Sequence, residues 1–149
     1  METNLSTKDL RAFLALSQTR NFGQTALQLH TSQSALSALI ARLEEQLGAR
    51  LFEEMLQRMP DIDAIFFCND DIAQGGLLAA HRLGVQVPAR IAMAGFNDLA
   101  GSDQMVPSLT TVRTPRSEVG REGAAMLLGM MRGSAAAPGS IELGYELVV

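Results

Sequence analysis

The chain has 149 residues, a formal net charge of −4 and 47% hydrophobic residues. This length suits one domain or two small ones, and the hydrophobic content is sufficient for a folded core, which excludes a disordered chain. Because no apolar run approaches the roughly 20 residues that span a bilayer and no basic region precedes an apolar core, we expect a cytoplasmic protein without a membrane partner.

The charge is unevenly distributed along the chain. Residues 1–52 carry five basic and four acidic side chains, whereas residues 53–149 carry seven basic and twelve acidic ones. Only the first segment can therefore approach nucleic-acid phosphates without general repulsion. Since its excess is a single positive charge, we expect weak DNA binding by one copy and a need for a homodimer.

The first expected element is a helix that is capped by Ser6 or Thr7 and ends near Gln18. We interpret it as a scaffold for the helices that follow. The residues expected to face those helices are Leu10, Phe13, Leu14 and either Leu16 or Ser17.

Residues 22–47 have the spacing of two helices that meet at a polar corner. Apolar residues recur at three- and four-residue steps on both sides of Thr31-Ser32, and Ser32 is able to cap the second helix. The pattern predicts a helix-turn-helix, in which the first turns of the second helix face base edges. An ordinary amphipathic helical hairpin has the same periodicity and remains the alternative. Gly48 is expected to end the second helix as a left-handed cap.

The segments LRAF (10–13), NFGQTA (21–26), LHTSQSALS (29–37) and RLEEQLGARLF (42–52) resemble the winged helix-turn-helix of LysR-type transcriptional regulators. The resemblance implies that residues 1–53 form a DNA-binding domain, that a wing begins at Ala49–Phe52, and that double-stranded DNA is the partner. Thr25 is expected either to contact the DNA backbone or to be plain surface. The residues predicted to contact DNA are Arg20, Gln24, Thr31, Ser32, Gln33, Ser34, Ser37 and Arg42.

Beyond residue 53 the pattern changes to that of a buried parallel sheet. Asp63–Cys68 is a short apolar run rich in Ile and Phe, which predicts a strand, and Arg90–Phe96 predicts a second one. Between them, Asn69-Asp70-Asp71 opens a helix that runs to about Leu83, with acidic residues at its positive end. Strand, helix and strand together predict a right-handed crossover unit.

The segments PDIDAIFFCNDDIAQGGLLAAHRLG (60–84), VPARIAMAGFNDL (87–99) and VPSLTTVRTPRSEVGREGAAMLLGMMRG (106–133) resemble the end of the effector domain of LacI/GalR-type, gluconate-like repressors. The resemblance implies that residues 54–149 are a truncated effector and dimerisation segment. It implies that Asn69 and Asn97 hydrogen-bond a sugar or sugar-acid effector, and that Ile72–His81 and Met105–Pro107 lie at a subunit contact. Both asparagines follow predicted strands, where open sheets bind ligands, but forming turns and caps is an equal alternative.

The last predicted elements are the helix Pro115–Arg132, a loop at Gly133–Gly139 and a strand within Ser140–Val149. In the resembled family that helix packs against a second lobe. Its apolar face is therefore expected to find a substitute partner here or to remain exposed. The face contains Val119, Met126, Leu127, Met130 and Met131.

No enzyme, metal or cofactor is predicted. Cys68 is a single cysteine within an apolar strand pattern and is expected to be a small core residue, and His30 and His81 have no partner at triad or metal-ligand spacing. Asp70-Asp71 is better explained as a helix N-terminal charge than as a general acid and base. The predicted fold is mixed: an all-α winged helix-turn-helix followed by a partial, periplasmic-binding-protein-like parallel α/β segment.

The predicted function is a DNA-binding transcriptional regulator with an incomplete sugar-type sensor segment. The alternative is an assembly or small-molecule-binding remnant of a LacI-type repressor that does not bind DNA. The acidic second segment motivates this alternative.

Overall fold

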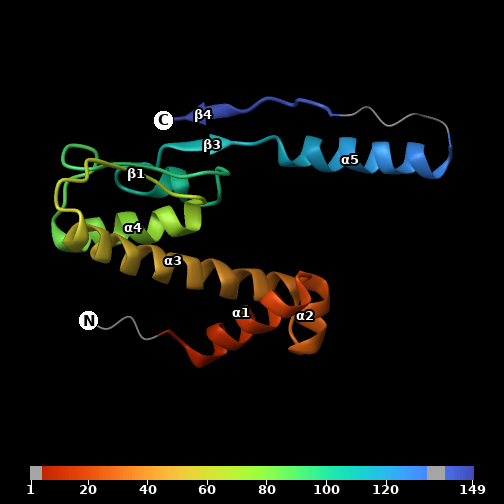
Figure 1. Ribbon diagram of the computed structural model, residues 1–149, viewed down its shortest axis with the longest axis horizontal. Helices are drawn as coiled ribbons and strands as arrows, with labels where there is room; N and C mark the ends of the chain where they lie inside the picture. The colour runs from red at the N-terminus through yellow and green to blue at the C-terminus, as the bar shows by residue number, and fades with distance from the viewer. Residues whose placement is uncertain (1–4, 134–139) are drawn as a thin grey trace.

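The long helix α3 (Gln33–Arg58) organises the computed structural model, which describes residues 5–133 and 140–149 (Figure 1). Helices α1 (Thr7–Thr19) and α2 (Phe22–Gln28) pack on its first half, and α4 (Asp70–Leu83) lies along its second half. The predicted domain boundary at residues 53 and 54 falls inside α3, which crosses it without a break.

Side-chain caps begin the first three helices. Ser6 accepts a hydrogen bond from the Lys8 amide, and Asn21 accepts one from the Gln24 amide. Ser32 accepts one from the Ala35 amide at 3.1 Å, so the predicted cap at Ser32 is confirmed. Between α2 and α3 the chain turns through residues 29–32, with His30 in the left-handed region at a φ of 50°.

The prediction of a wing is wrong. α3 continues through Gly48 and Ala49–Phe52 to Arg58, so Gly48 does not end the helix. A side chain at Gly48 would overlap the carbonyl oxygen of Ile72 on α4. Glycine is therefore needed here for close helix packing rather than for a left-handed cap.

α1 buries small residues rather than the predicted large ones. Ala12 and Ala15 are buried, whereas Leu10, Phe13 and Leu14 are exposed. The prediction that these three residues face the other helices is therefore wrong. Alanine on the inner face lets the backbone of α1 approach its neighbours closely.

The second half of the chain forms a small parallel sheet covered on one face by α4. β1 (Ala64–Phe66) pairs with β2 (Ala92–Ala94), with Ile65 opposite Met93, so the predicted parallel pairing is confirmed over shorter strands. Ile65 and Met93 are buried in the core with Phe52 of α3, but Phe66 is 66% exposed on the other face. Cys68 is also exposed, so its prediction as a core residue is wrong.

α4 lies between α3 and the sheet and is buried over most of its length. Within Ile72–His81 only Leu78 and His81 are exposed. The expectation that this stretch pairs two chains is therefore wrong, because α3 of the same chain covers it. The loop at Met105–Pro107 remains accessible, with Val106 83% exposed.

The C-terminal part extends away from this core (Figure 1). After η1 (Ser102–Gln104), β3 (Thr111–Arg113) pairs antiparallel with β4 (Glu146–Val148), and α5 (Arg116–Met131) lies between them in sequence. The predicted helix and final strand are confirmed, while residues 134–139 of the predicted loop lie outside the described residues. α5 has no buried residue. Its apolar face is exposed, and the most exposed members are Val119, Leu127, Met130 and Met131.

Candidate functional site

The first turns of α3 present uncharged polar side chains to solvent. Gln33, Ser34 and Ser37 are exposed, and Leu36 between them is fully buried against α1 and α2. The Ser32 and Ser34 hydroxyl groups lie 3.0 Å apart. This edge has hydrogen-bond donors and acceptors and no charge, which is the chemistry that reads base edges in a groove.

The residues predicted around the corner differ in accessibility. Arg20 and Gln24 are exposed and Thr31 is half-buried, so these three can approach a ligand on this face. Thr25 is fully buried and its hydroxyl donates to the Asn21 carbonyl at 2.8 Å. A DNA contact by Thr25 is therefore excluded by its burial.

Arg42 has a partner within the protein. Its guanidinium donates to Asp9 of α1 at 2.5 Å, and Asp9 is 1% exposed while Arg42 is 52% exposed. Asp9 Oδ2 is buried with no hydrogen-bond partner among the described residues. Arg42 thus neutralises a buried carboxylate and ties α1 to α3, a role that sequence reasoning missed.

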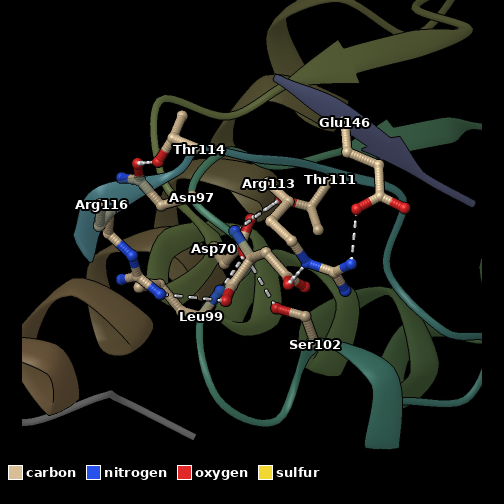
Figure 2. A network of polar contacts seen from close by, with 10 residues as sticks. Asp70, Asn97, Leu99, Ser102, Thr111, Arg113, Thr114, Arg116 and Glu146 are labelled. Atoms are coloured by element: carbon tan, nitrogen blue, oxygen red, sulfur yellow. Dashed lines mark hydrogen bonds and ion pairs between the residues drawn. The ribbon is translucent and has the colours of Figure 1, made fainter. Parts of the chain in front are cut away.

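The two predicted effector-binding asparagines follow β1 and β2, as expected. Asn69 caps α4 by accepting from the Ile72 amide at 2.9 Å, and its amide donates to Glu44 of α3 at 3.2 Å. Asn97 has a φ of 99° and accepts from the Thr114 hydroxyl at 3.4 Å (Figure 2). Both have the contacts that the cap-and-turn alternative requires, and effector binding by either stays a prediction.

Two carboxyl groups at the α3–α4 contact have raised pKa values. Partial burial raises the pKa of Glu44 from 4.5, with the charge of Asp71 adding to the rise and the Asn69 hydrogen bond opposing it. Burial, followed by the charge of Asp70, raises the pKa of Asp71 from 3.8. The contact therefore favours the protonated form of both groups.

Asp70 holds three segments together from the start of α4 (Figure 2). It is fully buried and accepts hydrogen bonds from the Leu99 amide at 2.7 Å, the Ser102 hydroxyl at 3.0 Å and the Thr111 hydroxyl at 2.7 Å. A side chain at Gly95 would overlap this carboxylate. Asp70 is thus more than the helix-end charge that was predicted, although no sequence signal distinguishes it from Asp71.

Within residues 5–133 and 140–149, no group of three or more His, Cys, Asp or Glu residues is placed to hold a metal ion. None of the helices in the described part of the chain is long and apolar enough to cross a membrane.

Comparison with known proteins identifies the family of this chain. The family described as periplasmic binding protein-like domain matches residues 2–149. The chain belongs to the periplasmic binding protein-like domain family. Its small parallel sheet, with α4 as the crossover helix, is the mixed α/β arrangement that was predicted for the second segment.

Relatives of this periplasmic binding protein-like chain include transcriptional regulators. It is 49% identical over 102 residues to the HTH-type transcriptional regulator GntR of Pseudomonas aeruginosa, covering 68% of this chain and 30% of the relative. It is 41% identical over 101 residues to the HTH-type transcriptional regulator IdnR of Escherichia coli, and the match covers 68% of this chain and 30% of the relative. The chain thus spans about a third of the length of these relatives.

Solved structures show the same relationship. The transcription regulator GntR of Chromobacterium violaceum superposes with a TM-score of 0.66 at 43% identity, covering 70% of this chain and 39% of that one. A transcriptional regulator CelR–cellobiose complex superposes with a TM-score of 0.65 at 30% identity, and the match covers 70% of this chain and 32% of the CelR chain.

These comparisons confirm the resemblance of the second segment to LacI/GalR-type regulators. They do not support the resemblance of the first segment to LysR-type regulators. The relatives include structures described as LacI family, which agrees with the prediction for the second segment. The LysR-type resemblance of residues 5–52 conflicts with them, since the matched family extends from residue 2. The helical corner at α2 and α3 is therefore described by its own geometry, without a LysR-type assignment and without a wing.

Proposed function

We propose that this chain is a cytoplasmic transcriptional regulator that binds double-stranded DNA through the corner between α2 and α3. The observation that carries the proposal is the exposed, uncharged edge of Gln33, Ser34 and Ser37, which is anchored from behind by the fully buried Leu36. This edge lies at the start of α3, which Ser32 caps. A recognition helix in a major groove presents its first turns to base edges in the same way. The names of the relatives, which are HTH-type transcriptional regulators, support the same function class.

The charges near the corner set the expected strength of binding. Arg20 is an exposed cation next to α2, and Arg42 is already paired with Asp9. The other exposed cations near the corner are Lys8 and Arg11 of α1, which lie beside Thr31. Few phosphate contacts are therefore available to one copy, and a homodimer that reads two half-sites would supply the missing affinity. Because α3 covers most of α4, the pairing surface has to lie elsewhere, and exposed apolar residues of α1 and α5 are available for it.

A salt-dependent mobility shift on a short DNA duplex of mixed sequence tests the proposal. We expect binding at low salt that weakens as salt rises, and loss of the shift in the Gln33→Ala, Ser37→Ala double variant. Gln57→Ala, an exposed change near the other end of the same helix, is the matched control. Absence of a shift at low salt, or equal shifts for both variants, overturns the proposal.

A second candidate is an assembly or small-molecule-binding segment without DNA binding, favoured by the exposed apolar face of α5. A sugar-acid effector at Asn69 and Asn97 belongs to this candidate. Since both side chains already have intramolecular partners, we expect gluconate to give no binding heat in calorimetry. Saturable heat that disappears in Asn69→Ala and Asn97→Ala would favour the second candidate instead.

A further inference from the structure

A small cavity lies where α1 meets the corner between α2 and α3. Its volume is about 220 Å³, below the roughly 300–1,000 Å³ of sites for drug-sized ligands. The residues that line it are Lys8, Arg11, Ala12, Leu29, Thr31 and Leu39. It is separate from Asn69 and Asn97, the residues predicted to bind an effector.

The cavity combines two cations with an apolar wall. Lys8 and Arg11 are three residues apart on α1, a spacing that places their side chains on one face of the helix. Neither forms an ion pair with another described residue, and the buried carboxylate on the same helix, Asp9, is paired with Arg42 instead. Ala12 is 2% exposed, and Leu29 and Leu39 are half-buried.

We propose that this cavity binds a small organic anion, a carboxylate on a compact apolar body. The carboxylate would pair with Arg11 and Lys8, since a guanidinium matches the two oxygens of a carboxylate. The apolar body would cover Leu29 and Leu39, which a free inorganic anion would leave in contact with water. The cavity includes Thr31 of the corner, so an occupant would lie beside the surface proposed for DNA, but the site does not depend on DNA binding.

Calorimetry of the full chain with three probes tests the site. Benzoate carries both features, benzyl alcohol lacks the charge, and inorganic phosphate lacks the apolar body. We expect saturable benzoate binding that is at least about tenfold tighter than binding of either other probe. Lys8→Gln combined with Arg11→Gln should weaken benzoate binding at least about tenfold, whereas Arg50→Gln, which changes an exposed cation outside the cavity, should not.

The outcomes separate this site from other uses of the same residues. Equal binding of benzyl alcohol and benzoate overturns the proposal, because the cavity would then be only an apolar hollow. Equal binding of phosphate and benzoate, with both lost in the Lys8 and Arg11 variant, also overturns the proposal. Lys8 and Arg11 would then be contacts for phosphate groups of the DNA backbone. No heat with benzoate, in protein whose circular dichroism shows intact helices, also overturns it.

Discussion

The backbone of Gly75 on α4 lies directly against the carbonyl group of Glu45 on α3. A side chain at Gly75 would overlap that carbonyl oxygen, just as one at Gly48 would overlap the carbonyl oxygen of Ile72. The two glycines thus form reciprocal contacts at one helix crossing. This crossing joins the helix that carries the proposed DNA surface to the helix that covers the parallel sheet.

Gly75→Ala and Gly48→Ala should therefore each destabilise the fold. The added methyl group meets backbone, which cannot move aside as a flexible side chain can, so we expect a loss of about 1–3 kcal/mol in the free energy of unfolding. Urea denaturation measures this loss. Gly123→Ala on α5 is the matched control, because nothing lies within 4 Å of the added carbon there, and it should be neutral or stabilising. Equal effects at all three positions would contradict the close crossing.

Arg42→Ala should weaken the packing of α1 on α3, because it leaves the buried Asp9 side chain without its partner. We expect a loss of about 1–3 kcal/mol. The double variant Asp9→Ala, Arg42→Ala should recover part of this loss, since the unpaired carboxylate is gone. The exposed Arg50→Ala serves as the control for loss of a cation on the same helix. A double variant less stable than Arg42→Ala alone would argue against this role for Arg42.

Asp70 and Asp71 are neighbours in sequence with opposite expected effects. Asp70→Ala removes the acceptor of three hydrogen bonds, and each hydrogen bond to a charged group contributes about 1.5–3 kcal/mol, so the fold should lose much of its stability. Asp71→Asn should be neutral or stabilising at neutral pH, because the pKa of Asp71 is raised by burial. Thermal unfolding of both variants distinguishes the two carboxylates, and similar losses would show that Asp70 has no special role.

The raised pKa values of Glu44 and Asp71 predict a pH dependence with a defined sign. A carboxyl group with a raised pKa binds protons more readily in the folded state than in the unfolded state, so its contribution to stability falls as pH rises above its ordinary value. Those ordinary values are 4.5 for Glu44 and 3.8 for Asp71. The Glu44→Gln, Asp71→Asn variant should therefore gain stability relative to the natural chain as pH rises through the mildly acidic range. Parallel pH profiles for the two proteins would contradict the prediction.

Local signals in the sequence located the elements well. Ser32 predicted the start of α3, and the Asn69-Asp70-Asp71 turn predicted the start of α4, because capping depends on neighbouring residues alone. The parallel pairing of β1 and β2 followed from two apolar runs separated by a helix. These features required no knowledge of distant contacts.

Features that depend on packing across the chain were missed. Gly48 looks like a helix end in the sequence, and only the presence of α4 makes it a mid-helix contact. Leu10 and Phe13 were expected inside because they are large and apolar, but the close approach of α1 favours alanine on the inner face. Phe66 lies on the uncovered face of the sheet and Cys68 lies in the bend after β1, and the apolar pattern alone could not reveal that either position is exposed.

Amide chemical-shift mapping of the full chain with a short DNA duplex at low salt tests the central claim most directly. We expect shifts concentrated at Ser32–Ser37 and around Arg20 and Gln24, with little change in α4 and the sheet. Shifts absent from the start of α3, or confined to α5 and the β3–β4 pair, would contradict DNA binding at the corner.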